Sequence, residues 1–208
     1  MSRGRAERLT AADGTRAVEL ARDAVRKFVD HGRREDPGSM RDSFYTRAGA
    51  FVRLETADGR GQLRGAASVP ARPSALPEKG NRLGHAIVEA AIKAASDTSR
   101  GAVSGAELSN LYVSLFVLRE GQSVADPRED VELGTHGVAL ERGDHVAWMY
   151  PTVPVRQGWS IAECLDRTAI KAGLGRGGWE ADDVQVTRLG GPVFEERDSE
   201  GDVERKMG

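Results

Sequence analysis

Strand-like runs in this chain come in adjacent pairs joined by tight-turn residues, rather than in regular alternation with helices. The first pair is formed by residues 50–56 and 62–68, with the Asp-Gly sequence of 58–59 between them, a favoured combination for a tight reversal. The second pair is formed by 137–142 and 145–150, which are separated by the turn residues Gly143 and Asp144. Paired strands of this kind indicate antiparallel sheets, so the pattern favours an α+β fold over a doubly wound parallel sheet.

Three segments repeat apolar residues at the i, i+3, i+4 spacing of a helix with one buried face. They are residues 11–29, 83–94 and 160–172. The third begins with Ser160 and Glu163, a capping box in which both side chains satisfy free amides of the first helical turn. We therefore predict helices in these three segments, to be packed against the sheets.

Further strands are predicted from short apolar or alternating runs. Residues 111–118 alternate Leu and Val with other side chains and read as a central strand, while 183–189 and 193–195 read as the last two strands. The polar segment 30–49 is predicted to be a long surface loop. The charged tail after Glu195 is predicted to be frayed.

Composition excludes several classes of protein. Thirty basic against 32 acidic residues give a net charge of -2, so nucleic acid is an unlikely default partner. No apolar run is long enough to cross a bilayer, which argues against a membrane role, and the charged start lacks a secretory signal. We expect a soluble, cytoplasmic protein of 208 residues that forms one folding unit.

The sequence offers no obvious metal or cofactor site. The four histidines do not have the spacing of metal ligands, and no cysteine cluster accompanies them. They are His31, His85, His136 and His145. The one cysteine, Cys164, falls inside the third predicted helix, where a buried apolar role is expected. The glycine-rich run 173–178 closes that helix instead of opening one, so we interpret it as a helix terminator rather than a phosphate loop.

Arg64 and Gly65, in the second strand of the first hairpin, allow two interpretations. A guanidinium followed by a residue without a side chain lets an anion approach closely, which would make this a binding site. Alternatively, Gly65 forms a bulge in the strand and Arg64 pairs with a carboxylate within the fold. Residues alone leave both interpretations open.

Several short motifs, taken together, resemble the AMMECR-type domain family over roughly residues 13–196. The family's L-R-G-C-I-G hexapeptide is half retained, as Leu-Arg-Gly-Ala-Ala-Ser at 63–68. The other matching segments, in the family's order and spacing, are Pro151-Thr152-Val153-Pro154-Val155, Gly158-Trp159, Lys171-Ala172-Gly173-Leu174, Trp179 and Phe194-Glu195-Glu196.

The resemblance implies a two-lobed α+β fold with an antiparallel sheet and flanking helices. It implies an AMMECR-type domain at 13–196, with flexible termini at 1–12 and 197–208. No biochemical activity is firmly assigned to the family. Its members often occur with, or fused to, a Memo-type protein and a radical-SAM protein, which implies an accessory or enzymatic role in a shared pathway.

This chain departs from the family pattern at places where chemistry would be expected. Ala66 replaces the cysteine of the hexapeptide, and an alanine can neither attack nor donate a proton. Ala169 stands near where the family commonly has a second cysteine, and Cys164 is displaced from it by five positions. At residues 97–100 this chain has Asp-Thr-Ser-Arg in place of the family's D-P-R-F-like segment. Any activity that depends on the family thiol is therefore in question.

Three functional hypotheses follow. The first is a ligand- or partner-binding accessory protein that takes a small anionic ligand, or a Memo-type or radical-SAM partner, and needs no cofactor. Its candidate binding residues are Arg64, Gly65, Ser68, Pro151, Pro154, Trp159 and Lys171. The second is an enzyme acting on a small molecule or modified biomolecule, for which His85, Glu163 and Lys171 are candidates without assigned roles. The third is an RNA-binding protein, which charge and sparse aromatics disfavour.

Overall fold

The computed structural model describes residues 9–38, 41–57, 61–76, 82–197 and 202–207. Its α-helices are α1 (Ala11–His31), α2 (Leu83–Ala95), α3 (Pro127–Asp130), α4 (Thr152–Gln157) and α5 (Ile161–Lys171). Its 3-10 helices are η1 (Asp42–Tyr45), η2 (Pro73–Ala75), η3 (Gly105–Asn110) and η4 (Gly178–Glu180). Its strands are β1 (Gly49–Thr56), β2 (Leu63–Val69), β3 (Leu111–Leu118), β4 (Glu120–Ser123), β5 (Gly137–Arg142), β6 (His145–Met149), β7 (Gln185–Gly190), β8 (Val193–Glu196) and β9 (Val203–Met207).

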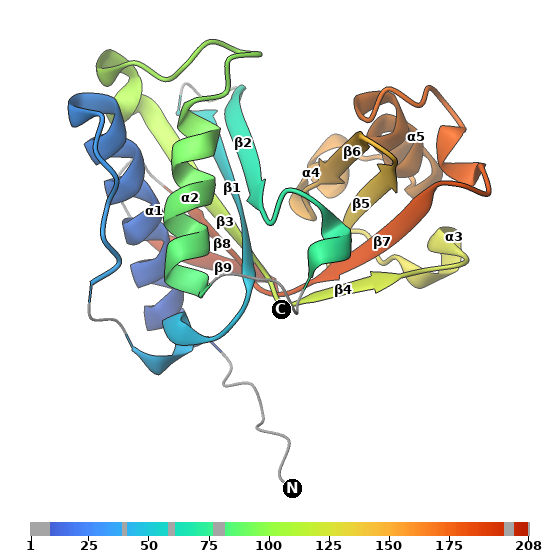
Figure 1. The fold of residues 1–208 in the computed structure, drawn as a ribbon, viewed down its shortest axis with the longest axis horizontal. Coiled ribbons are helices and arrows are strands. Elements are labelled where there is room, and N and C mark those ends of the chain that lie inside the picture. The colour runs from blue at the N-terminus through green and yellow to red at the C-terminus, as the bar shows by residue number, and fades with distance from the viewer. Residues whose placement is uncertain (1–8, 39–40, 58–60, 77–81, 198–201, 208) are drawn as a thin grey trace, which may run out of the picture.

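The strands form two antiparallel sheets, which confirms the α+β expectation (Figure 1). One sheet has the order β2-β1-β3-β8-β9, and the other has the order β4-β7-β5-β6. As predicted from its alternating pattern, β3 is central, because it is the third of five strands. Helices α1 and α2 lie side by side on one face of the five-stranded sheet, while α5 belongs to the second lobe (Figure 1).

Two continuous chain segments pass from one sheet to the other and so connect the lobes. β3 continues into β4 through Arg119, and β7 continues into β8 through Gly191 and Pro192. The two crossings lie against each other, since the Arg119 amide donates to the Gly190 carbonyl at 3.0 Å. At Gly191, with φ +148°, a β-carbon would come within 1.8 Å of the Val117 carbonyl oxygen, so the crossing requires glycine.

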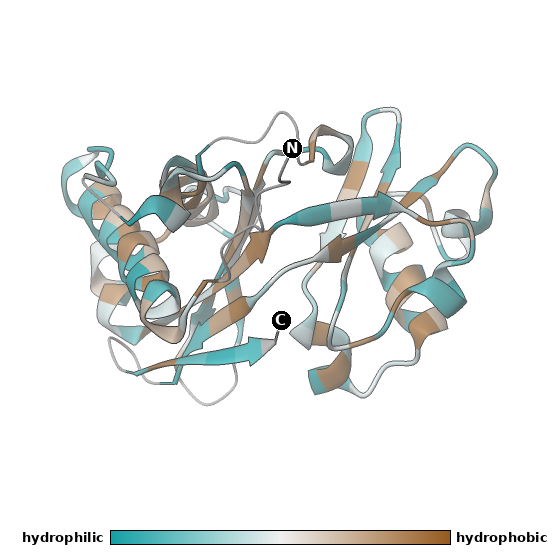
Figure 2. Cartoon of the chain, turned by 90° about the horizontal axis from the view of Figure 1, so that it is seen from below, coloured by the Kyte–Doolittle hydropathy of each residue, from teal (hydrophilic) through white to brown (hydrophobic). Residues whose placement is uncertain are grey.

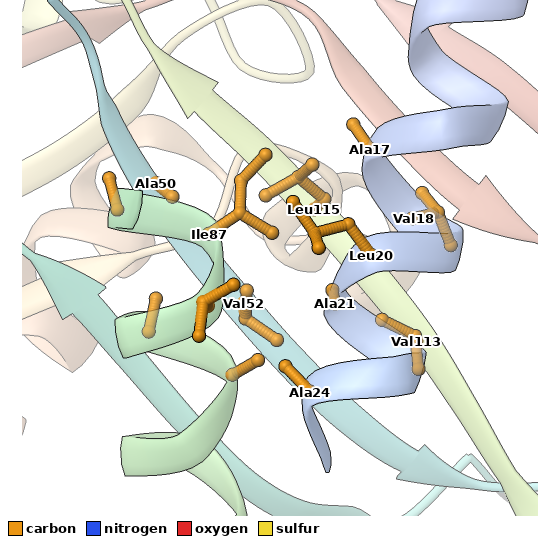
Figure 3. Packing of buried hydrophobic residues seen from close by; sticks show 14 of the residues in the cluster. Ala17, Val18, Leu20, Ala21, Ala24, Ala50, Val52, Ile87, Val113 and Leu115 are labelled. Atoms are coloured by element: carbon orange, nitrogen blue, oxygen red, sulfur yellow. The ribbon is translucent and has the colours of Figure 1, made fainter. Parts of the chain in front are cut away.

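The strands of the five-stranded sheet present different chemistry on their two faces. On β1, Val52 points towards α1 and α2 (Figure 3), and Leu54, two residues on, belongs to the same large apolar core. The alternate residue Phe51 points the other way and packs edge-on against Trp148 and Tyr150 of the second lobe. Aromatic packing therefore joins the lobes on the face of the sheet that the helices leave free.

The helix boundaries follow from local capping chemistry. In α1 the Thr10 hydroxyl accepts from the Asp13 amide at 3.2 Å while the Asp13 carboxylate accepts from the Thr10 amide at 2.9 Å. The helix then ends at Gly32, which has a left-handed φ of 61°. The capping box predicted at the start of α5 is confirmed, because Ser160 and Glu163 cap the helix in the same reciprocal way.

None of the helices in these described ranges is long and apolar enough to cross a membrane.

Several sequence expectations are corrected by the structure. The predicted loop at 30–49 contains η1, in which Phe44 is buried against the main core. The segment 203–207, expected within a frayed tail, forms β9 and pairs with β8, and Figure 2 shows this strand, which leads to the C-terminus, as largely hydrophilic. The Asp-Gly turn expected at 58–59 lies outside the described residues. The domain limits of 13–196 remain a prediction.

Candidate functional site

Two charged residues of β1 are buried on the face of the sheet opposite α1 and α2. Arg53 and Glu55 are each only 7% exposed, and they alternate with the apolar residues that face the helices. Burying a charge is costly unless a partner of opposite charge and hydrogen bonds compensate it. The partners that compensate the charges of Arg53 and Glu55 therefore need to be identified on this face of the sheet.

Arg53 and Glu55 belong to an ionic network that reaches across to the second lobe. The Arg53 Nη2 atom donates to Glu55 Oε1 at 2.8 Å, and Arg156 Nη1 of α4 donates to Glu55 Oε2 at 3.4 Å. Arg156 Nη2 also donates to Glu195 of β8, whose other oxygen accepts from Thr152 at 3.0 Å. We call these five residues the charged network. It ties strands of the first lobe to one helix of the second.

Two polar atoms, one within the charged network and one next to it, have no hydrogen-bond partner among the described residues. They are Arg53 Nη1 and the Tyr150 hydroxyl, both fully buried. The Arg53 guanidinium lies over the Tyr150 ring, 5.2 Å from its centroid. Burial, reinforced by the negative charge of Glu195, raises the pKa of Tyr150 well above its ordinary value, so its hydroxyl stays protonated and able to donate. The network and the Tyr150 hydroxyl thus carry donor capacity that the described residues do not use.

A pocket of about 800 Å³ opens next to the charged network. Its wall is formed by the charged face of the five-stranded sheet, by α4 and by β9. The residues that line it are Arg53, Glu55, Thr56, Gly61, Leu63, Tyr112, Ser114, Val153, Arg156, Gln157, Glu195, Glu196, Arg197, Glu204 and Lys206. Its volume falls within the range of about 300 to 1,000 Å³ that is usual for small-molecule sites. We call this space the inter-lobe pocket.

The acidic groups at the rim of the inter-lobe pocket are already neutralised. Glu196 receives two hydrogen bonds from Arg22 of α1, one of them at 2.7 Å from Nε. Glu204 of β9 is paired with Lys206 at 2.7 Å and with Arg197 at 3.0 Å. The remaining charged residues of the pocket lining are therefore those of the charged network itself.

The residues 18–194 match the model of the AMMECR1 family. A Halobacterium salinarum protein is 50% identical over 203 residues, covering 97% of each chain, and a Thermococcus onnurineus protein is 32% identical, covering 91% of this chain and 93% of that one. The chain belongs to the AMMECR1 family. The fold agrees, because the crystal structure of an uncharacterised Pyrococcus horikoshii protein matches with a TM-score of 0.79 at 30% identity, over 93% of this chain and 96% of the other.

In this AMMECR1-family protein the hexapeptide arginine is engaged within the fold. Arg64 Nε donates to Glu107 of η3 at 2.6 Å, and Nη1 donates to the Arg100 carbonyl at 2.9 Å. Arg64 is also the extra residue of a bulge, because Leu54 faces Gly65 while Glu55 faces Leu63. The pairing with a carboxylate agrees with the intramolecular interpretation of Arg64, whereas the bulge lies at Arg64 and not, as that interpretation had it, at Gly65. The side chain fastens the segment between α2 and β3.

The Arg64–Glu107 pair gives a pH-dependent prediction. The hydrogen bond from Arg64 lowers the pKa of Glu107 from 4.5 to about 2, so its stabilising contribution is present above pH 4.5 and is lost as the pH falls towards 2. Because both side chains are partly exposed, we expect Arg64→Gln to cost at most about 1 kcal/mol at pH 7, and less at pH 3. Urea unfolding at both pH values measures this difference.

A matched control for this prediction removes an exposed surface pair. Arg142→Gln breaks the pair with Asp183, and we expect it to change stability by less than about 0.5 kcal/mol at either pH. An Arg64→Gln effect of the same size at pH 7 and pH 3 would show that Glu107 does not carry the effect.

The other hexapeptide candidates lie on different faces of β2. Gly65 faces α2, where a β-carbon would come within 1.9 Å of the Ala94 carbonyl oxygen. Ser68 is half-buried and lies opposite Phe51 in the register, on the inter-lobe face. Ala66, which replaces the family's cysteine, lies opposite Arg53 and packs against the inter-lobe aromatic cluster. A methyl group therefore lies beside the charged network, at the position where the resemblance to the family implies a cysteine.

The segment 151–159, which carries two of the family motifs, contains the short helix α4. Pro151 is its N-cap, and Pro154 lies in its first turn, where the missing amide hydrogen costs no hydrogen bond. Both prolines are buried, while Trp159 is half-buried with the Arg167 guanidinium 5.4 Å from its ring centroid. These three residues shape α4, and it is Arg156 of the same helix that reaches the inter-lobe pocket.

The candidates for general acid or base catalysis are not brought together. His85 is exposed on α2, and Glu163 is engaged in the cap of α5. Lys171 is at the opposite end of α5 from Glu163, which is about 12 Å along a helix axis. Cys164 is fully buried, as predicted, and burial raises the pKa of its thiol to about 11, so it is a poor nucleophile.

The sequence analysis overlooked Arg53, Glu55 and Arg156. The signal was present in β1, where charged residues occupy alternate positions of an otherwise apolar strand and must share one face. Glu195 was noted only as part of a family motif. Among the described residues, no group of three or more His, Cys, Asp or Glu side chains is placed to hold a metal ion.

Proposed function

We propose that this protein binds a small ligand with an anionic group in the inter-lobe pocket. The observation that carries the proposal is the buried guanidinium of Arg53, with one nitrogen unused by the described residues, beside an unused Tyr150 hydroxyl. An unpaired buried donor costs on the order of 1 to 3 kcal/mol, and a ligand carboxylate or phosphate would remove that cost. The mixed charge of the pocket lining suits a ligand that also carries hydrogen-bond donors.

The ligand-binding role does not require a cysteine in the hexapeptide, where this chain has Ala66. Ala66 lies beside Arg53 in the register, so the inter-lobe face offers recognition by charge and hydrogen bonding but no thiol. The family's association with Memo-type and radical-SAM proteins is the reason to propose an accessory role in a shared pathway. In this view the bound ligand would be a substrate, product or regulator of that pathway.

A thermal-shift screen tests the proposal with matched arginine variants. Carboxylated and phosphorylated metabolites, nucleotides and S-adenosylmethionine are tested against the wild type, Arg53→Gln and Arg64→Gln. At about 100 times its dissociation constant a ligand adds about 2.7 kcal/mol, which is roughly 5 to 10 °C for a chain of this size. We expect Arg53→Gln to abolish the shift and Arg64→Gln to preserve it.

The opposite pattern of results would contradict the assignment of the site. A shift that survives Arg53→Gln but is lost in Arg64→Gln would move the site to the hexapeptide arginine. Circular dichroism and the unliganded melting temperature show that each variant is folded before its ligand response is compared. If no compound shifts the folded wild type at millimolar concentration, a protein partner becomes the better proposal.

A further inference from the structure

Among the described residues that line the inter-lobe pocket, Tyr112 of β3 is the one aromatic residue. Its neighbours along the strand, Leu111 and Val113, are buried in the core under α1 and α2. Because side chains alternate along a strand, Tyr112 faces the other way, towards the charged face of the sheet. It is half-buried, which leaves part of the side chain open to the pocket.

The Tyr112 ring has no aromatic or cationic partner in the part of the chain that the structure describes. The other two tyrosines differ in this respect. Tyr150 packs against two phenylalanine rings and the Arg53 guanidinium, and Tyr45 of η1 carries the Arg82 guanidinium 5.5 Å from its ring centroid. A ring without such a partner, set in the wall of a pocket, is suited to stack on a planar group of a ligand.

The register of the sheet puts Tyr112 next to the buried guanidinium of Arg53. Tyr112 lies opposite Glu55 and Arg53 lies opposite Ser114, so Tyr112 and Arg53 are diagonal neighbours on one face of the sheet. Diagonal positions of this kind are about 7 to 8 Å apart. The Arg53 guanidinium also donates to Glu55 at 2.8 Å, and Glu55 is the residue directly opposite Tyr112. One small molecule can therefore reach both Arg53 and Tyr112.

The pocket lining beside Tyr112 includes apolar and amide groups. Leu63 of β2 lies opposite Glu55 on the other side from Tyr112, and Val153 belongs to α4. Both are half-buried and line the pocket, so a planar group in this place would bury apolar area against them. Gln157 of α4 adds an amide that can donate to, and accept from, polar atoms of a ring.

We propose that the ligand of the inter-lobe pocket carries a planar aromatic ring, which stacks on Tyr112 while its anionic group binds Arg53. The inference rests on the proposed function, because it names the class of ligand for the same pocket. Nucleoside monophosphates and aromatic carboxylic acids share this chemistry, since each joins a planar ring to an anionic group in one small molecule. A sugar phosphate or an aliphatic acid has the anionic group alone and would leave the Tyr112 ring uncovered.

Two pairs of probes test the ring requirement by NMR titration of the full chain. AMP is compared with ribose phosphate, and phenylpropionate with cyclohexylpropionate, so the members of each pair share the anionic group and differ in the planar ring. We expect the aromatic member of one pair to bind the wild type at least about fivefold more tightly than its counterpart. Tyr112→Leu should remove this preference, whereas Tyr112→Phe should retain it because phenylalanine keeps the ring. The pair that shows the preference distinguishes a nucleotide from an aromatic acid.

Tyr45→Leu is the matched control, because it removes a tyrosine ring on η1 that is outside the pocket lining, and it should leave both affinities unchanged. Arg53→Gln should weaken both members of the preferred pair, which separates binding of the anion from binding of the ring. Equal binding within both pairs, or a preference that survives in folded Tyr112→Leu, would overturn the inference, while loss of binding in Arg53→Gln would still support the anionic site. If none of these probes binds at millimolar concentration, the ring inference is also overturned, and the wider thermal-shift screen decides the proposed function.

Discussion

Replacing Gly65 with alanine is expected to destabilise this protein by at least about 3 kcal/mol, lowering its melting temperature by roughly 6 to 12 °C. The new β-carbon would lie 1.9 Å from the Ala94 carbonyl oxygen, well inside van der Waals contact. That oxygen belongs to the backbone of α2, so no side chain can rotate away to relieve the clash. The helix would have to shift away from β2, opening the apolar core that it covers.

A glycine elsewhere in the chain provides the matched control for Gly65. At Gly105 a β-carbon would meet nothing nearer than the Asp30 carboxylate at 3.4 Å, and the backbone there is not left-handed. Gly105→Ala should therefore change stability by less than about 0.5 kcal/mol in urea unfolding. If Gly65→Ala were equally mild, the glycine would not serve close helix packing, and its place in the hexapeptide would have to be explained by a ligand.

The regular elements were predictable where one periodicity extends over many residues. The strand at 111–118 and the helix at 83–94 are confirmed almost to the residue, because the helix has a clear apolar face and the strand is buried on both of its faces. β4, with the sequence Glu-Gly-Gln-Ser, has no such face and exists because it continues β3 into the second sheet. β9 is a charged edge strand, whose pattern resembles a solvated tail. Strands of this kind depend on their neighbours rather than on their own residues.

The candidate site was less predictable because its members are distant in the chain. Arg156 and Glu55 are separated by 101 positions, and no local pattern reveals that α4 turns the arginine towards β1. The family motifs at 151–159 include α4, in which the buried prolines shape the helix and Arg156 makes the contact with Glu55. Sequence could therefore indicate the region, whereas the pairing of charges depends on how the lobes pack.

The charged network should respond unequally to the loss of the two partners of its Arg156–Glu195 ion pair. Arg156→Ala would leave the Glu195 carboxylate, only 3% exposed, without its cation, and we expect a loss of about 3 kcal/mol in urea unfolding at pH 7. Glu195→Gln leaves Arg156, which is 46% exposed, with Glu55 and solvent, so it should cost roughly 1 to 2 kcal/mol. The Thr152 hydroxyl can still donate to the amide oxygen of the glutamine.

The double variant decides whether the two charges act on each other. Because Glu195→Gln removes the buried charge that Arg156→Ala would leave unpaired, the double variant should be more stable than the sum of the single effects predicts, by about 1.5 to 3 kcal/mol. The exposed pair Arg16 and Glu19 serves as the control cycle, with an expected coupling of under about 0.5 kcal/mol. If the costs at Arg156 and Glu195 simply add, the network does not join the lobes through this pair, and Glu195 is held by Thr152 alone.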